Sequence, residues 1–252
     1  MVIQGRKFNT HPVQIRNMGQ EEQFSGFPED CLEFLANLES NNNRKWFKDH
    51  REEYDQFVVS PAQEFIASLG ELLASEIDGI VYDTSSGGWG SLMRIYRDVR
   101  FSRDKTPYHT SIRMVFWHEC GHRTNGAGFY MGFGPRTGGF YAGQYGFDRS
   151  TLGAYRKDID RDSRGKNLES IIAQVEEKGY QVGGETYKRV PRGFDPDHPR
   201  ARLLRHSGLY AKLEGVDSGV LLGPDAVDIS YKHFIEMSPL VLWLLDVIAG
   251  RA

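Results

Sequence analysis

The feature that most limits the possible folds is a central block in which short runs of β-branched and aromatic residues are separated by glycines. Runs of this composition and length are typical of strands, and short glycine-containing connections are typical of hairpins. The predicted strands cover residues 92–98, 112–117, 128–133 and 139–145. Because helical patterns flank the block, we predict an α+β fold, a mostly antiparallel central sheet with N-terminal and C-terminal helices packed on it.

Apolar residues at helical spacing lie on both sides of this block. Ser60, Pro61 and Gln63 predict an N-cap, a first-turn proline and a capping box, and Asp148 predicts another N-cap. No clear linker divides the chain, so residues 27–252 are predicted to form a single domain behind a flexible leader at residues 1–26. The other main helices are predicted from Pro28 onward, at residues 44–57, at residues 168–178 and at residues 231–249.

Composition excludes several classes of protein. The net charge is −3, whereas domains that grip duplex nucleic acid usually carry a basic excess, so nucleic-acid binding is not expected. The apolar run at residues 240–248 is far shorter than the ~20 residues that span a bilayer. Cys31 and Cys120 are widely separated, which indicates reduced thiols and a cytoplasmic location. The sequence indicates no oligomeric state.

The densest polar segment runs from Arg94 to His109. Arginine forks and lysines close to aspartates can form a rigid ion-pair network, or they can leave donors available for a phosphate or carboxylate. A third alternative is an exposed face with no special role. Arg192 and His198, in a later irregular stretch, are further candidates for the same pocket. If the segment binds a ligand, the expected contacts are Arg97, Arg100 and Lys105, with Asp98 or Asp104 orienting them and Tyr108 donating a hydrogen bond.

The same segment carries a resemblance. The run Arg97-Asp98-x-Arg100-Phe101-Ser102-x-Asp104-Lys105-x-Pro107-Tyr108 resembles the hallmark of a widespread uncharacterised family of conserved hypothetical proteins, a domain of unknown function. The resemblance covers roughly residues 27–249 and implies one α+β domain, but it supplies no catalytic residues. One departure is His109, where most members are expected to have lysine. Supporting stretches are Asn42-Asn43-Arg44-x-Trp46-Phe47 with Tyr54, Val190-Pro191-Arg192-Gly193 with His198-Pro199, and Phe234-x-x-Met237-x-Pro239-Leu240 with Leu244.

The run His118-Glu119-Cys120-Gly121-His122 matches the zinc-peptidase pattern H-E-x-x-H. That pattern needs a helix, because only a helix presents residues four apart to one metal ion. Here a strand-like run precedes it and turn residues follow it, so we predict a hairpin loop. A zinc site built from His118, Cys120 and His122 is chemically feasible, but neither a metal nor a cofactor is expected.

Three functional hypotheses therefore stand. The first is a cytosolic protein that binds a small anionic ligand through the Arg97–Tyr108 segment, with enzymatic activity uncertain. The second is a metal-dependent hydrolase that uses His118, Glu119 and His122. The third is a non-catalytic interaction module, since aromatic residues make up 12% of the chain and the C-terminal helix is apolar. The sequence contains no nucleophile elbow, Walker loop or dinucleotide fingerprint.

Overall fold

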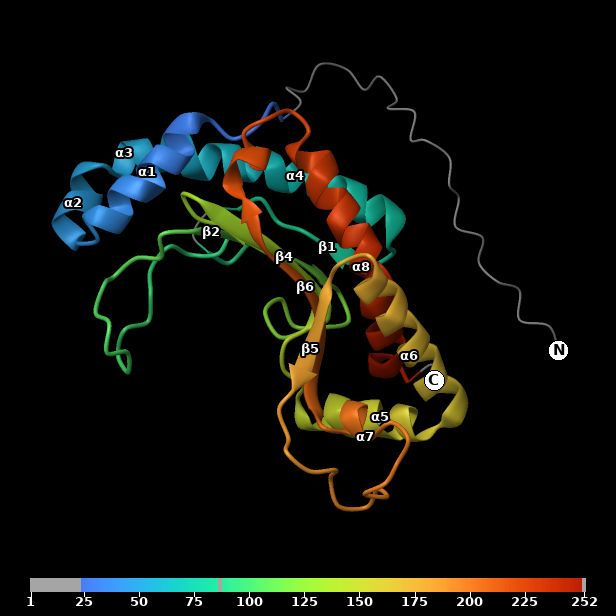
Figure 1. Ribbon diagram of the computed structural model, residues 1–252. Helices are drawn as coiled ribbons and strands as arrows, with labels where there is room; N and C mark the ends of the chain where they lie inside the picture. The colour runs from blue at the N-terminus through green and yellow to red at the C-terminus, as the bar shows by residue number, and fades with distance from the viewer. Residues whose placement is uncertain (1–23, 86–87, 251–252) are drawn as a thin grey trace.

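The computed structural model describes residues 24–85 and 88–250. It confirms the α+β class: a six-stranded sheet in the order β1-β2-β3-β4-β6-β5, with every neighbouring pair antiparallel (Figure 1). The strands are β1 Ile80–Val81, β2 Ile112–His118, β3 Gly128–Phe133, β4 Thr137–Gln144, β5 Gln181–Glu185 and β6 His206–Asp217.

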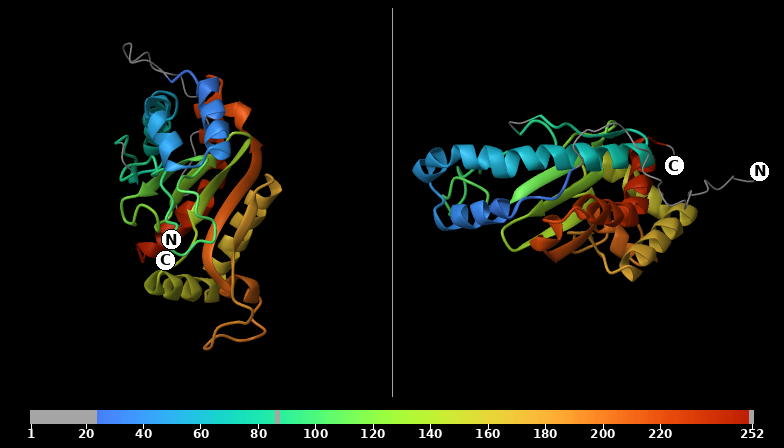
Figure 2. Two further views of the ribbon diagram at one scale, coloured as in Figure 1. Left: turned by 90° about the vertical axis from the view of Figure 1, so that its left-hand side faces the viewer. Right: turned by 90° about the horizontal axis from the view of Figure 1, so that it is seen from above.

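Helices precede, interrupt and follow the sheet in the chain. The C-terminal helix α8 packs on β4 and also contacts three other helices, α4, α5 and α6 (Figures 1 and 2). The helices are α1 Glu29–Ser40, α2 Arg44–Asp49, α3 Arg51–Tyr54, η1 Asp55–Val59, α4 Ser60–Glu76, α5 Arg149–Asp160, α6 Asp162–Glu177, α7 Ala201–Leu204, η2 Ser218–Leu221 and α8 Ala226–Ile248. In the described residues no helix is both long and apolar enough to cross a membrane.

One face of the sheet is covered by α8. Side chains alternate across a strand, so every second residue of each strand faces the helix. Three of these are phenylalanines from β2, β3 and β4, and all three pack around Phe234 of α8 with ring centroids 5.1 to 6.1 Å apart. Complete burial of an aromatic ring contributes about 1.5–3 kcal/mol, so this cluster fixes α8 on the sheet. The three residues are Phe116, Phe129 and Phe140.

The residues between them point to the opposite face, called the open face below. Strand register arranges them in three rows that run across β2, β3, β4 and β6. Two of the rows have glycines in both central strands, which lowers the surface there. The rows are Arg113, Gly132, Gly139 and Glu214; then Val115, Tyr130, Tyr141 and Lys212; then Trp117, Gly128, Gly143 and Tyr210.

The predicted capping box at Ser60 is wrong. Residues 51–76 form one continuous helical run, in which Ser60 has helical dihedral angles and donates its N–H to the Asp55 carbonyl. That five-residue spacing marks a π turn directly before Pro61. A proline inside a helix removes a hydrogen bond and crowds the preceding turn, and a π turn is one way to accommodate it. The Gln63 side chain donates to the Thr84 carbonyl at 2.7 Å instead.

A second proline lies inside α8. Pro239 has no N–H to donate to the Ile235 carbonyl, four residues earlier. The Ser238 hydroxyl replaces that donor at 2.9 Å. The carbonyl is therefore satisfied and the helix continues to Ile248.

Other expectations need correction. Residues 92–98 form only isolated bridges, from Leu92 to Met114 and from Tyr96 to Tyr108, and not a strand. Strands β1, β5 and β6 were not predicted, and α8 begins at Ala226, five residues before the predicted position. Most of the predicted leader lies outside the described residues, but Phe24, at its end, is buried against Phe27 and Phe65.

Candidate functional site

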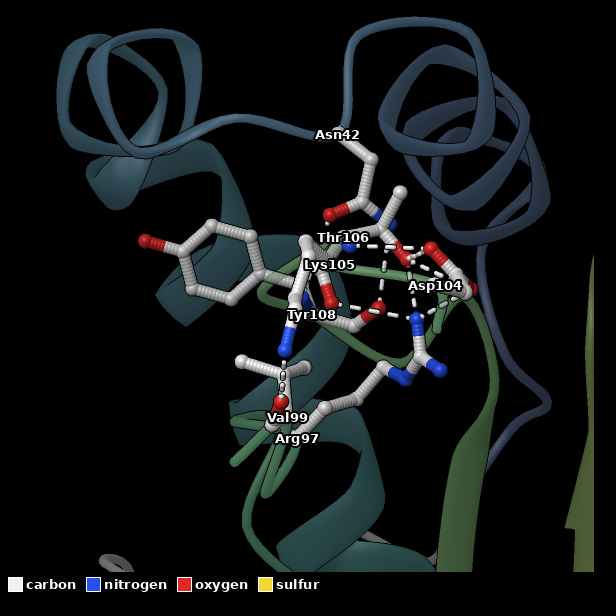
Figure 3. A network of polar contacts seen from close by, with 7 residues as sticks. All are labelled: Asn42, Arg97, Val99, Asp104, Lys105, Thr106 and Tyr108. Atoms are coloured by element: carbon white, nitrogen blue, oxygen red, sulfur yellow. Dashed lines mark hydrogen bonds and ion pairs between the residues drawn. The ribbon is translucent and has the colours of Figure 1, made fainter. Parts of the chain in front are cut away.

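The predicted ligand residues lie on a loop that leaves the edge of the sheet. The Arg97 N–H donates to the Pro107 carbonyl and the His109 N–H donates to the Ile95 carbonyl, each at 2.8 Å. These two bonds join the two ends of a loop formed by residues 97–107, called the charged loop below (Figure 3). Exposure alternates along the start of this segment although it is not a strand, because Arg94, Tyr96, Asp98 and Arg100 are exposed while Ile95 is buried.

Arg97 points inward and holds the loop together. Its guanidinium lies 2.5 Å from the Asp104 carboxylate and 3.1 Å from the Thr106 carbonyl, and it also contacts the Thr106 hydroxyl (Figure 3). The Thr106 N–H donates to Asp104 at 2.9 Å. That backbone bond, followed by the Arg97 side chain, lowers the pKa of Asp104 to about 2. The Arg97 side chain is only 23% exposed, so this is the best-shielded charge of the loop.

The other two predicted cations are also occupied. Arg100 forms a two-pronged contact with Asp98, with the closest nitrogen and oxygen 2.7 Å apart, and its side chain is 78% exposed. The Arg100 side chain is the main cause that lowers the pKa of Asp98 to about 2. Lys105 donates to the Val99 carbonyl at 2.9 Å. Each cation expected to bind a ligand therefore already has a partner inside the loop.

The base of the loop is fastened by residues far away in the sequence. Tyr96 and Tyr108 face each other as a bridge whose hydrogen bonds are made by their neighbours, so the N–H and carbonyl of Tyr108 point outward. The Asn42 side chain satisfies both groups, at 3.1 and 3.0 Å. The Tyr108 ring is buried and stacks on Phe47 at 4.2 Å. Both blocks carry the family resemblance, but the sequence did not predict that they meet.

Charges without an acidic partner gather beside the loop base. The Arg113 side chain is half-buried, donates to the Arg94 carbonyl at 2.7 Å, and has a buried Nε with no hydrogen-bond partner among the described residues. Burial lowers the pKa of Arg113. Burial, followed by Arg113, Arg97 and Arg94, lowers the pKa of His109 to about 4, so this histidine is neutral at pH 7.

A cavity of about 380 Å³ lies on the open face. Its floor contains Gly128 and Gly143, which are register partners on β3 and β4. Gly143 has a φ of +130°, and a Cβ there would lie 2.3 Å from the Leu209 carbonyl oxygen, so the backbone demands glycine. The walls are mainly aromatic: Tyr130, Tyr141, Tyr145 and Tyr210, with Met93 and Val115.

Arg123 is the charged residue of the cavity lining. Its two terminal nitrogens donate to the carbonyls of Gly90 and Gly88, at 2.7 and 3.0 Å. Within the described residues no carboxylate lies at ion-pair distance from it. The pKa of Asp83 is lowered mainly by the Ser85 N–H, which donates to this carboxylate at 2.7 Å, and least by the charge of Arg123. Arg123 therefore brings a net positive charge to an otherwise aromatic cavity.

One tyrosine of the cavity belongs to a polar chain. The Tyr141 hydroxyl donates to Glu214 at 2.7 Å, and Glu214 also contacts Lys212. Burial, followed by the hydrogen bond to Glu214, raises the pKa of Tyr141. The hydroxyl is therefore a hydrogen-bond donor and not a base at neutral pH.

The H-E-x-x-H run lies where it was predicted, in the connection between β2 and β3. His118 ends β2, and its ring contacts Cys120 and the Asp78 carbonyl. His122 contacts Thr124 instead. The two histidines therefore have different partners, and the described residues hold no group of three or more histidine, cysteine or acidic side chains that could bind a metal ion.

The later candidates lie elsewhere. His198 contacts Asp160 of α5 at 3.5 Å and accepts from the Arg200 N–H. Arg192 is exposed on the connection between β5 and α7. Neither residue lines the open-face cavity.

The comparisons with known proteins identify a family but no activity. The model of the family described as conserved hypothetical protein DUF2461 matches residues 30–243. No curated protein matches the chain. The match covers β1 to β6, the charged loop and the open-face cavity.

Proposed function

The chain belongs to the DUF2461 family of conserved hypothetical proteins, and we propose that it binds a small anionic ligand with an aromatic ring in the open-face cavity. One observation carries the proposal: an aromatic cavity contains a guanidinium group that has no carboxylate partner at ion-pair distance. Small-molecule sites are typically mostly apolar hollows of about 300–1,000 Å³ with a few polar groups that fix orientation, and this cavity fits that description.

The aromatic part of the ligand would lie on the glycine floor between tyrosines. Tyr145 stacks on Tyr210 with ring centroids 5.3 Å apart, and Tyr130 meets Tyr141 edge-on at 5.5 Å. Tyr130 and Tyr141 lie in the row next to the one that contains Gly128, and Tyr210 lies at the β6 end of that row itself. A planar ring stacked on one aromatic side chain gains about 1–3 kcal/mol in the case of nucleobases.

The anionic part of the ligand would contact Arg123. Its carbonyl partners leave the positive charge uncompensated, and a carboxylate or phosphate is the group that guanidinium binds best. The half-buried Arg113, on the same face of the sheet, adds to the positive potential.

The charged loop has a different role in this proposal. Because Arg97, Arg100 and Lys105 already have partners, we propose that the loop supports the edge of the sheet and does not supply the ligand's counter-charge. Direct binding through Arg97, Arg100 and Lys105 is the competing proposal. The proposal concerns binding and not catalysis, and it assumes the cytoplasmic location that the sequence predicts.

The test is a thermal-shift screen of the purified chain against inorganic phosphate, benzoate-type aromatic carboxylates and nucleoside monophosphates. A ligand at 100 times its Kd stabilises a fold by about 2.7 kcal/mol. We expect aromatic anions to stabilise the protein more than phosphate does. The stabilisation should disappear in Tyr145→Ala, because that ring is 84% exposed and contributes little to the core, and in Arg123→Gln.

Two matched controls separate the competing sites. Tyr187→Ala removes another exposed tyrosine, one that contacts Arg156 and does not line the cavity. Arg100→Gln removes an exposed charge of the loop. Both variants should keep the ligand effect. A ligand whose effect is lost in Arg100→Gln and kept in Tyr145→Ala would refute the cavity and favour the loop.

A further inference from the structure

We infer that Cys120 and His118 form an activated thiol–imidazole pair that exchanges with small-molecule disulfides. His118 is the last residue of β2 and the first histidine of the run that matches the zinc-peptidase pattern, and Cys120 occupies a variable position of that pattern in the β2–β3 connection. The His118 Nδ1 atom is 3.0 Å from the Cys120 Sγ atom. The Cys120 backbone N–H also donates to Nδ1, at 3.2 Å, which holds the cysteine against the ring.

The other ring nitrogen fixes the tautomer. His118 Nε2 lies 3.1 Å from the carbonyl oxygen of Asp78. A carbonyl oxygen can only accept, so Nε2 carries the hydrogen and the Nδ1 lone pair faces both the Cys120 thiol and the Cys120 backbone N–H. A nucleophile, a base within hydrogen-bond reach, and a third group that orients the base are the arrangement that activates cysteine in enzymes.

The fold makes room for this ring position. Gly79, beside Asp78, has a φ of +81°, and a Cβ there would lie 2.5 Å from His118 Nε2. Any other residue would push the imidazole away from the Asp78 carbonyl. The ring position therefore depends on a glycine outside the motif, in the turn before β1.

The two cysteines of the chain differ sharply. Cys120 is exposed, whereas Cys31 is fully buried in α1 and burial raises its pKa to about 12. A reagent in solution therefore meets Cys120 and not Cys31 while the protein is folded. His122, in the same connection, contacts Thr124 and serves as a matched control for His118.

The reaction balances without another reagent. The Cys120 thiol gives its proton to His118 Nδ1, and the thiolate attacks one sulfur of the disulfide. The new sulfur–sulfur bond forms as the old one breaks, and the departing thiolate takes the proton from the imidazolium. Cys120 is oxidised to a mixed disulfide, and one half of the small disulfide is reduced to a thiol.

The test uses 5,5′-dithiobis(2-nitrobenzoate) at pH 6.5, where an ordinary thiol with a pKa of about 8.5 is about 1% thiolate. We expect one thiol per folded chain to react, at least about tenfold faster than glutathione under the same conditions. His118→Gln should lower the rate constant about tenfold, His122→Gln should leave it unchanged, and Cys120→Ser should abolish the reaction.

Folding is checked in the same assay. A folded variant leaves Cys31 unreactive, whereas an unfolded histidine variant releases two equivalents and an unfolded Cys120→Ser releases one, since the chain has two cysteines. A wild-type rate no greater than that of glutathione would overturn the inference without any variant. Equal rates for wild type and a folded His118→Gln variant would overturn it as well.

Discussion

The charged loop and the open-face cavity both concentrate polar and aromatic groups, but their charged side chains have different partners. In the loop, Arg97, Arg100 and Lys105 are each matched by an acceptor two to nine residues away. In the cavity, Arg123 reaches back 33 and 35 residues to two carbonyls and has no carboxylate at ion-pair distance among the described residues. In the loop Arg97 and Arg100 are paired with carboxylates and Lys105 with a carbonyl, whereas the cavity arginine has carbonyl partners alone.

The difference teaches that charge density along a sequence does not show which charges find a carboxylate partner in the fold. Acids and bases that are close in sequence can pair within one loop, whereas a cation set among apolar side chains on a sheet finds no such partner. Ionic groups with a shifted pKa occur at structural sites as well as functional ones. The lowered pKa values of Asp98 and Asp104 come from contacts inside the charged loop, and neither residue lines the cavity.

The largest effect should come from the packing at the base of the loop. Phe47→Ala removes a buried ring that stacks on Tyr108, so we expect a loss of about 3 kcal/mol in the free energy of unfolding. Phe101→Ala is the matched control, because Phe101 is 95% exposed on the same loop. Its effect should stay within about 0.5 kcal/mol. Urea denaturation measures both, and equal losses would contradict the assignment of the base as the anchor.

The Asn42 clamp should come next. Asn42→Ala leaves the N–H and carbonyl of Tyr108 without their partners, which costs about 2 kcal/mol. Asn42→Asp keeps the acceptor for the N–H and loses the donor, so its loss should be smaller. Hydrogen exchange at the Tyr108 amide should accelerate in the alanine variant more than in the aspartate variant. Unchanged exchange in both would show that the loop base holds without Asn42.

The ion pairs of the loop should have smaller effects that differ by exposure. Arg97→Gln removes charged hydrogen bonds from a mostly shielded side chain and should destabilise the protein by about 1 kcal/mol. Arg100→Gln removes an exposed pair with Asp98 that solvent screens, and should leave stability nearly unchanged. Urea denaturation at low and high salt separates the two. A larger loss for Arg100→Gln would reverse the roles assigned here.

The sequence predicted the three central strands closely, because β-branched and aromatic runs bounded by glycines have few alternatives. Strand β6 was missed although Leu209, Ala211 and Leu213 alternate with polar residues, a period-two pattern that was available in the sequence. The nearby prolines and glycines obscured it. Residues 92–98 show the reverse error, since they alternate but pair with the sheet only at single bridges.

The candidate sites were less accessible to sequence reasoning. The cavity depends on register, which places Gly143 of β4 between Gly128 of β3 and Tyr210 of β6. The loop clamp joins Asn42 to Tyr108, 66 residues apart. No local pattern encodes either contact, because both arise from packing between separate elements. The location of the H-E-x-x-H run was predictable, since its strand and turn context is local.

The last prediction concerns His109, which lies between the loop and the open face. Its folded-state pKa is lowered to about 4, first by burial and then by the charges of Arg113, Arg97 and Arg94. The unfolded chain, with a histidine pKa of about 6.5, binds the proton more readily. The contribution of His109 to the free energy of unfolding is therefore fully present above about pH 6.5. It decreases as the pH falls from there toward 4.

Histidine ring resonances in NMR spectra test this prediction directly, and the His109 signal should stay in its neutral position down to about pH 4. Replacing Arg113 by Gln should raise the midpoint, because the positive charge with the largest effect on His109 is removed. Arg100→Gln should leave it unchanged, because that charge is not among those that act on His109. If both variants shifted the midpoint equally, the positive potential would belong to the charged loop as a whole. A shift in Arg113→Gln alone would place the positive potential at the edge of the open face, the face to which the proposed anionic ligand would bind.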